Sequence, residues 1–283
     1  MDKASTIILA SSLIIIMFGM GLSLTLADFK RIIQHPKAVV NGLINQLIFL
    51  PLVGFLLASV FDVRPEIAVG IMILAACPGG ATSNLITHLA KGDTALSVTL
   101  TAVASLITVL TIPFIVQFSL EKFLGSEQEV VLDVPKTIGQ LMVITVIPIS
   151  IGMFLRVRAQ KFAFRMEKPV KIASAVVFVL VVAGLLVKER TNIIPYFKEA
   201  GIMALILNVV TMTIGLLSSR LLSLPKRQAM SIAIESGIQN GTLAITIATV
   251  TLGNSELGIA GAIYGLVMFL TGGILIFVGN AKS

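Results

Sequence analysis

The chain has 283 residues, of which 56% are hydrophobic and 12% charged, and its mean hydropathy is +1.02. A water-soluble fold cannot bury so much apolar surface, so the composition excludes a soluble protein and predicts a polytopic membrane protein. The net charge of +7 would suit nucleic-acid binding. The basic residues lie in short segments between apolar runs, however, where they are typical of membrane topology signals. The single cysteine excludes an internal disulfide.

The apolar runs predict an all-α membrane protein with nine transmembrane helices of about 20 residues each. The first run continues through Leu26 without an obvious cleavage site, so we interpret it as a retained helix rather than a signal peptide. The whole chain, 1–283, is therefore expected to form one polytopic unit. In chain order, the predicted spans are 5–26, 38–60, 66–90, 93–119, 135–156, 169–187, 197–223, 228–251 and 257–279.

Two of the predicted spans are interrupted by residues that break helices. The third contains Cys77–Asn84, which includes a proline and paired glycines, and the eighth contains Glu235–Gly241, which includes two glycines. Proline removes a backbone donor and glycine weakens a helix, while nearby polar side chains can satisfy the backbone groups that are freed.

The orientation of the chain follows from its basic residues. With nine spans, fourteen of the 21 Lys and Arg residues fall on the side that holds the C-terminus. The positive-inside rule makes that side cytoplasmic, so we expect a multi-pass protein of the plasma (inner) membrane with its N-terminus outside. The largest contribution comes from a predicted loop between spans five and six, which contains Arg156, Arg158, Lys161, Arg165 and Lys168.

The positions of the two interruptions predict an internal repeat. One interrupted span is third in the first run of four, and the other is third in the last run of four, with span five as a linking helix. Corresponding spans are an odd number apart, so the second run is inverted relative to the first. Inverted repeats with matched broken helices are typical of secondary transporters. The sequence has no ATP-binding loop of the GxxxxGK[ST] type, which argues against a pump.

Glu235 is the ionisable residue that the span assignment places deepest in the membrane. A carboxylate in hydrocarbon costs several kcal/mol or more, so it needs a partner or an aqueous cavity. Gly237 and Gly241 follow it and allow the helix to open. A carboxylate at a helix break is a place to hold a cation, which points to ion-coupled transport.

Oxygen-bearing side chains near both interruptions could complete a cation site. Ser83 and Asn84 follow the first break, and Ser97 and Thr101 share one face of the next span. The alternative is that these hydroxyls only bond back to carbonyls of their own helices. A second cage could combine Glu235 with the groups Ser236, Ile238 and Gln239.

Gln46 lies inside span two and is open to two interpretations. It joins the second cage if span two abuts span eight, and otherwise it is a polar residue that links helices.

At these residues the chain strongly resembles the bile acid:sodium symporter family. The resemblance covers nearly the whole chain, and the last two of the matching stretches are the most specific. The stretches are MFGMGLSLTLADF (17–29), HPKAVVNGLINQLIFLP (35–51), CPGGATSNLITHLAKGDTALSVTLTAVASL (77–106) and AIESGIQNGTLA (233–244).

The resemblance implies a core domain, about 38–119 and 197–279, in which the two broken helices cross. It also implies a panel domain, about 5–26 and 135–187. Two sodium ions would be co-transported. By residue-to-residue matching, sodium site 1 is Ser83, Asn84, Ser97, Thr101 and Glu235, and sodium site 2 is Gln46, Glu235, Ser236, Ile238 and Gln239.

The expected function is sodium-coupled import of an organic anion, such as a bile acid, pantoate or a keto acid, by alternating access. The substrate carboxylate is expected near Ser83, Asn84 and Asn240, and the protein is expected to function as a monomer in the bilayer without nucleic acid. Two rivals remain open. One is a proton-coupled or efflux carrier of organic acids on the same fold, and the other is an intramembrane enzyme that uses Cys77 or His88. We expect a transporter rather than an enzyme.

The orientation can be tested by cysteine labelling in a Cys77→Ala background. Cysteines at Lys161 and Ser283 should be protected from impermeant thiol reagents in intact, right-side-out cells, because both positions are assigned to the cytoplasm. A cysteine at Ser126 should be labelled. The opposite labelling pattern would refute the orientation.

Overall fold

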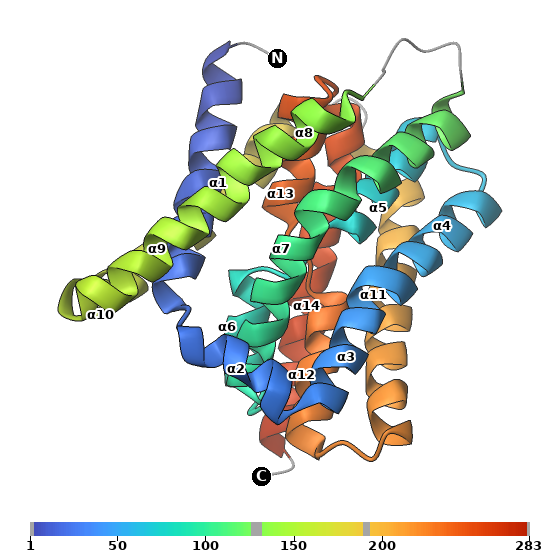
Figure 1. The fold of residues 1–283 in the computed structure, drawn as a ribbon. Coiled ribbons are helices and arrows are strands. Elements are labelled where there is room, and N and C mark those ends of the chain that lie inside the picture. The colour runs from blue at the N-terminus through green and yellow to red at the C-terminus, as the bar shows by residue number, and fades with distance from the viewer. Residues whose placement is uncertain (1–2, 126–131, 189–192, 282–283) are drawn as a thin grey trace.

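The computed structural model describes residues 3–125, 132–188 and 193–281, and these form helices with no β-strand (Figure 1). Among them, five helices are long and apolar enough to cross a membrane, or six if one bent pair counts as a single span. The nine-span count stays a prediction. Ser126 and Ser283 lie outside the described residues.

In chain order the helices are α1 (Lys3–Ser23), α2 (Leu26–Gln34), α3 (Pro36–Ile44), η1 (Asn45–Phe49), α4 (Leu50–Val60), α5 (Pro65–Ala76), α6 (Ala81–Leu89), α7 (Thr94–Ser119), η2 (Leu120–Leu124), α8 (Val134–Leu141), η3 (Met142–Val146), α9 (Ile147–Arg158), α10 (Gln160–Lys188), α11 (Ile193–Leu221), α12 (Lys226–Gly237), α13 (Gly241–Thr246), η4 (Ile247–Thr251), η5 (Glu256–Gly258) and α14 (Ile259–Ala281).

The first predicted span ends earlier than expected and turns into a second helix. After α1 the axis bends by 67° into α2. Asp28 accepts a hydrogen bond from the backbone N–H of Thr25 at 2.7 Å, which caps the start of α2. None of the residues of α2 is buried, so this short helix lies on the surface of the protein.

The predicted basic loop between spans five and six is wrong. Arg156 and Arg158 form the last turn of α9, and Lys161 and Arg165 already belong to α10, so Ala159 alone separates the two helices. Lys, Arg and Gln favour helices, and basic residues in a last turn interact favourably with the helix dipole. The positive charges are therefore carried by helix ends rather than by a loop.

Wide π-helical turns precede two of the prolines inside the long helices. In η1 the N–H of Leu50 bonds to the carbonyl of Asn45, and Pro51 follows. In η3 the N–H of Ile147 bonds to the carbonyl of Met142, and Pro148 follows. Because proline lacks an N–H and its ring presses on the carbonyl four residues earlier, one extra residue per turn lets each helix continue past it.

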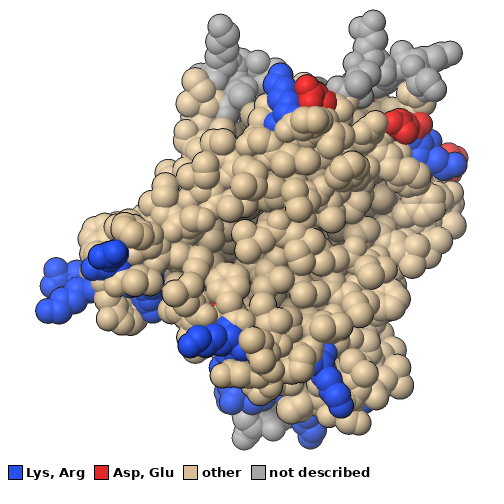
Figure 2. Space-filling model, viewed as in Figure 1, with Lys and Arg blue, Asp and Glu red and all other residues tan. Residues whose placement is uncertain are grey.

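The helices form two groups in space. On one side α1 packs along α9 and α10 (left in Figure 1), while α11, α12 and α14 pack together with α5 on the other. In the view of Figure 2 most of the surface between the two ends of the molecule is uncharged, whereas Lys and Arg gather at the end where the C-terminus lies and at the tip where α9 meets α10. This pattern fits a belt of lipid-facing residues between two wetted ends.

The contact between α1 and α9 depends on two glycines. A Cβ added at Gly152 would lie 2.5 Å from the carbonyl oxygen of Phe18 and 2.7 Å from the nitrogen of Leu22. A Cβ at Gly21 would collide with the carbonyl oxygen of Ile149. Small residues thus let the two backbones touch, which is the usual way that membrane helices associate.

Replacing Gly152 with alanine should therefore separate α1 from α9. We expect Gly152→Ala to lower the free energy of unfolding by about 1–3 kcal/mol, a typical cost of overpacking, seen as a lower melting temperature of the purified protein. Gly139→Ala is the matched control, because a Cβ there meets nothing within 4 Å. An unchanged melting temperature for Gly152→Ala would show that the α1–α9 contact is not close-packed.

Candidate functional site

The two helix breaks meet inside the protein. The first lies between α5 and α6 and the second between α12 and α13, as their proline and glycine residues predicted. The backbones of Gly79 and Gln239 form an isolated antiparallel bridge. The N–H of Asn240 donates to the carbonyl of Pro78 at 2.9 Å. Each break therefore satisfies backbone groups that the other leaves without a helical partner.

The carboxylate of Glu235 lies beside this junction and is completely buried. Its Oε1 accepts a hydrogen bond from the hydroxyl of Ser97 at 2.5 Å, and its Oε2 accepts one from Thr101 at 2.8 Å. The ion pairs found among the described residues lie elsewhere. A carboxylate in this position has donors, but no basic side chain of the described chain neutralises it.

The cluster around Glu235 contains more oxygen atoms than hydroxyl protons that could link them by hydrogen bonds. The Oδ1 of Asn84 lies 2.8 Å from the hydroxyl of Ser97 and 3.3 Å from that of Thr101, and Ser83 lies 3.5 Å from Thr101. Each hydroxyl has one proton. Ser97 cannot donate to Glu235 and Asn84 at once, and Thr101 also faces the carbonyl of Ser97 at 3.0 Å, as the back-bonding alternative expected. All five residues predicted for sodium site 1 are thus in one cluster.

Gly79 makes room for the carboxylate. A Cβ at this position would lie 2.5 Å from Oε2 of Glu235 and 3.2 Å from the hydroxyl of Ser83. Any larger residue would push the carboxylate away from the first break. The glycine therefore serves the close approach of two chain segments that are far apart in sequence.

The residues predicted for sodium site 2 are also brought together. Gln46, in η1, donates to Oε1 of Gln239 at 3.0 Å, so span two does contact the second break. The amide nitrogen of Gln239 donates to the carbonyls of Ser236 at 2.8 Å and Glu235 at 3.2 Å. The Oε1 of Gln46 is buried without a hydrogen-bond partner, and Ile238 is fully buried in the break itself. The oxygen atoms around the amide nitrogen of Gln239, together with the unpartnered oxygen of Gln46, are ligands of the kind that a hard cation prefers.

The residues predicted to contact substrate lie at the same junction. Asn240 accepts a hydrogen bond from the N–H of Leu243 at 3.0 Å and so caps α13. A Cβ at Gly80 would touch Asn240 at 3.7 Å, and the hydroxyl of Ser83 donates to the carbonyl of Gly80 at 2.7 Å. Asn240 is 6% exposed and Ser83 is fully buried, so a substrate reaches this point only after a movement.

Two residues that were not predicted from the sequence hold the second break. Asn208 of α11 and Tyr264 of α14 each donate to the carbonyl of Gly237 at 2.7 Å. Both side chains are completely buried. The available signal was a lone amide and a tyrosine within apolar runs, but their common target could not be known before α11 and α14 were placed around α12.

A second group of missed residues adjoins Gln46. Asn45 donates to the hydroxyl of Ser218 at 3.0 Å, and Asn41 donates to that of Ser219 at 3.1 Å. These bonds attach span two to α11. The spacing of Asn41 and Asn45, which places both on one helix face, was the signal for this contact.

Comparison with known proteins identifies the family. Residues 10–196 match the model of the Sodium Bile acid symporter family. The chain belongs to this family. It is similar to the uncharacterized sodium-dependent transporter YocS of Bacillus subtilis (31% identity over 83% of this chain and 71% of the relative). It is also similar to the human ileal sodium/bile acid cotransporter (31%, 89% and 72%) and to the probable chloroplastic sodium/metabolite cotransporter BASS1 of Arabidopsis thaliana (28%, 93% and 64%).

The family assignment makes the protein a membrane transporter and not an enzyme. The positions of Cys77 and His88 also do not support the enzymatic alternative. Cys77 is a free, completely buried thiol at the end of α5. His88 lies in the last turn of α6, at the end of the helix that is farther from the break.

The support given by Tyr264 to the second break can be measured. Tyr264→Phe removes one of two donors to a buried carbonyl that Asn208 still satisfies, and we expect it to cost about 0.5–1.5 kcal/mol in the free energy of unfolding. Thr213→Val is the control, because that exposed hydroxyl bonds to the carbonyl of Val209 in its own helix. Equal melting temperatures for the two variants would contradict a role for Tyr264 at the break.

Proposed function

We propose that this protein is a sodium-coupled symporter that imports a small organic anion by alternating access. The observation that carries the proposal is the buried carboxylate of Glu235, surrounded by hydroxyl and amide oxygens with too few protons to link them. Such a cluster is stabilised by a cation. Sodium is the cation named in the family and in the three relatives.

Two ions sharing one carboxylate would explain how sodium recruits an anion. Sodium site 1 would be formed by the Ser97–Thr101–Asn84 cluster with Ser83, and sodium site 2 by the group around Gln46 and Gln239. With both ions present, the single negative charge of Glu235 is exceeded by one positive charge. The junction then attracts an anion, whereas without sodium it repels one.

The substrate carboxylate is placed by this proposal at the junction, beside Asn240, Ser83 and Asn84. The bridge between Gly79 and Gln239 connects these residues to both ion sites, so ions and substrate order the same backbone. Coupling would then act through a shared element and not through direct contact between substrate and sodium. One relative is named for bile acid and another for a metabolite, and we propose a bile acid, pantoate or a keto acid as the substrate class.

The contacts between helices support a division into a panel and a core. α1 packs on α9 and α10, which corresponds to the proposed panel, and α5, α11, α12 and α14 pack around the breaks in the proposed core. We propose nine spans arranged as inverted repeats, in the plasma membrane, with the N-terminus outside. The basic end of the molecule in Figure 2 would then face the cytoplasm.

The rival is a proton-coupled carrier, and the same cluster gives it a specific observation. One added proton on Glu235 would also relieve the competition for the hydroxyl proton of Ser97, which faces two acceptors at 2.5 and 2.8 Å. The two mechanisms differ in the gradient that drives uptake. Proteoliposomes in which sodium and pH gradients are imposed separately therefore distinguish them.

We expect uptake of radiolabelled pantoate, a bile acid or a short keto acid to require an inward sodium gradient. Glu235→Gln should raise the sodium concentration for half-maximal uptake by about 100-fold or more, because removing the charged partner of a buried ion costs ~3–5 kcal/mol. It should also remove the stabilisation of the purified protein by sodium. Glu199→Gln is the matched control, since that glutamate pairs with Arg64 near the surface.

Two outcomes would overturn the proposal. Wild-type sodium dependence in Glu235→Gln would exclude this carboxylate as an ion ligand. Uptake driven by a pH gradient in the absence of sodium would establish the rival.

A further inference from the structure

A groove with a volume of about 1150 Å³ lies beside α12, and no residue of either helix break belongs to its lining. α11 and α14 form its sides, and α12, the end of α6 and the connection from α6 to α7 complete it. Neither the residues proposed for sodium nor those proposed for substrate line it. The groove is therefore a feature separate from the transport site.

The walls of the groove are apolar and open sideways. Its lining includes Met212 and Leu216 of α11 and Leu275 and Val278 of α14. At its edges Val209 is 47% and Ile274 54% exposed, although both belong to helices long and apolar enough to cross a membrane. Exposed apolar residues on such helices face lipid, so the groove is accessible from the bilayer.

One end of the groove is strongly basic. Four cationic side chains belong to its lining, and no Asp or Glu does. Two of them, Arg220 in the last turn of α11 and Lys226 at the start of α12, are exposed on either side of the connection between these helices. The complete set of cationic residues is Lys91, Arg220, Lys226 and Arg227.

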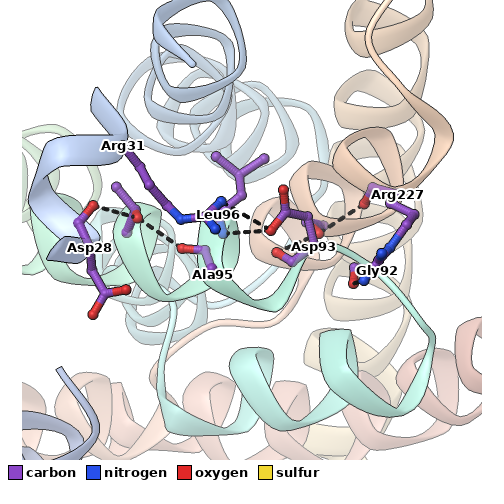
Figure 3. Close-up of polar contacts among 9 residues, drawn as sticks. Asp28, Arg31, Gly92, Asp93, Ala95, Leu96 and Arg227 are labelled. Carbon is purple, nitrogen blue, oxygen red and sulfur yellow. Dashed lines mark hydrogen bonds and ion pairs between the residues drawn. The ribbon is translucent and has the colours of Figure 1, made fainter. Parts of the chain in front are cut away.

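The carboxylate of Asp93, which follows the lining residue Gly92 in the sequence, is paired with another side chain. Asp93 accepts a hydrogen bond from the N–H of Leu96 at 3.1 Å and pairs with Arg31 at 3.5 Å (Figure 3). Arg227 donates to the carbonyl of Gly92 at 3.2 Å, which fixes a guanidinium at the rim (Figure 3). Arg220, Lys226 and Arg227 therefore give the rim a net positive charge.

We propose that this groove binds one anionic phospholipid, with its phosphate at the basic rim and an acyl chain along the apolar walls. The rim lies at the ends of α11 and α14, where headgroups lie relative to membrane-spanning helices. Basic pockets between such helices are suited to anionic headgroups. A soluble anion would leave the apolar walls unfilled, and a zwitterionic lipid would leave the cationic rim uncompensated. The lipid would connect α11 to the start of α12, the helix that ends at the second break.

The test uses the purified full-length protein in detergent, with native mass spectrometry to count bound lipid and thermal unfolding to measure stabilisation. The probes are dioleoylphosphatidylglycerol, dioleoylphosphatidylcholine and inorganic phosphate. We expect one tightly bound phosphatidylglycerol and a raised melting temperature, with neither effect from phosphatidylcholine or phosphate. The proposal does not depend on the transported substrate or ion, so its failure is separate from failure of the proposed function.

Two variants locate the lipid. Arg220→Gln with Lys226→Gln should weaken phosphatidylglycerol binding about 30-fold, from about fivefold for each basic residue at a membrane surface. Leu216→Trp should abolish phosphatidylglycerol binding, because it fills the groove although it keeps the rim charges. The control is Lys30→Gln with Lys37→Gln, an equal loss of charge at exposed positions on α2 and α3, which should change binding less than twofold.

Four results would overturn the proposal. Equal binding of phosphatidylcholine would show that charge is not recognised. Equal stabilisation by inorganic phosphate would make this a site for soluble anions. Equal losses in the control and the rim variant, or full binding by Leu216→Trp, would place the lipid outside the groove.

Discussion

A carboxylate that is removed from water must be compensated, and the interior of this protein is arranged around that requirement at Glu235. Gly79 leaves space for the carboxylate, and the hydroxyls of Ser97 and Thr101 reach it from α7. None of these groups supplies a positive charge. In the proposed mechanism the compensation comes from an ion or a proton that arrives and leaves, which would distinguish this site from a permanent buried salt bridge.

The same junction solves a second problem, which is the cost of unpaired backbone groups inside a membrane protein. An interrupted helix leaves donors and acceptors that lipid cannot satisfy. Here the two interruptions satisfy one another through Gly79, Gln239 and the bond from Asn240 to Pro78. Neither break would be stable alone, so the geometry of the cluster around Glu235 depends on both halves of the chain.

The parts of the site that could be predicted from sequence are those with a local signal. Pro78 and its glycines marked one break, and Glu235 was recognisable because a charge is rare in an apolar run. The support from Asn208 and Tyr264 could not be foreseen, because it depends on which helices surround α12. The basic segment after Arg156 was wrongly predicted to be a loop because it lies between two apolar runs, although its residues also favour helices. The span count and the repeat rest on pattern alone.

The wide turn η1 sets the rotational phase of span two. An α-helix turns by about 100° per residue. The extra residue in this turn therefore rotates the side chains before it relative to the side chains after it. Asn45 and Gln46 are consecutive, yet one bonds to Ser218 and the other to Gln239. Deleting a single residue between Asn45 and Phe49 would leave a helix long enough for the membrane, but the polar side chains of span two would no longer all face their present partners. Insertions and deletions in this segment are therefore under a constraint that hydrophobicity alone would not reveal.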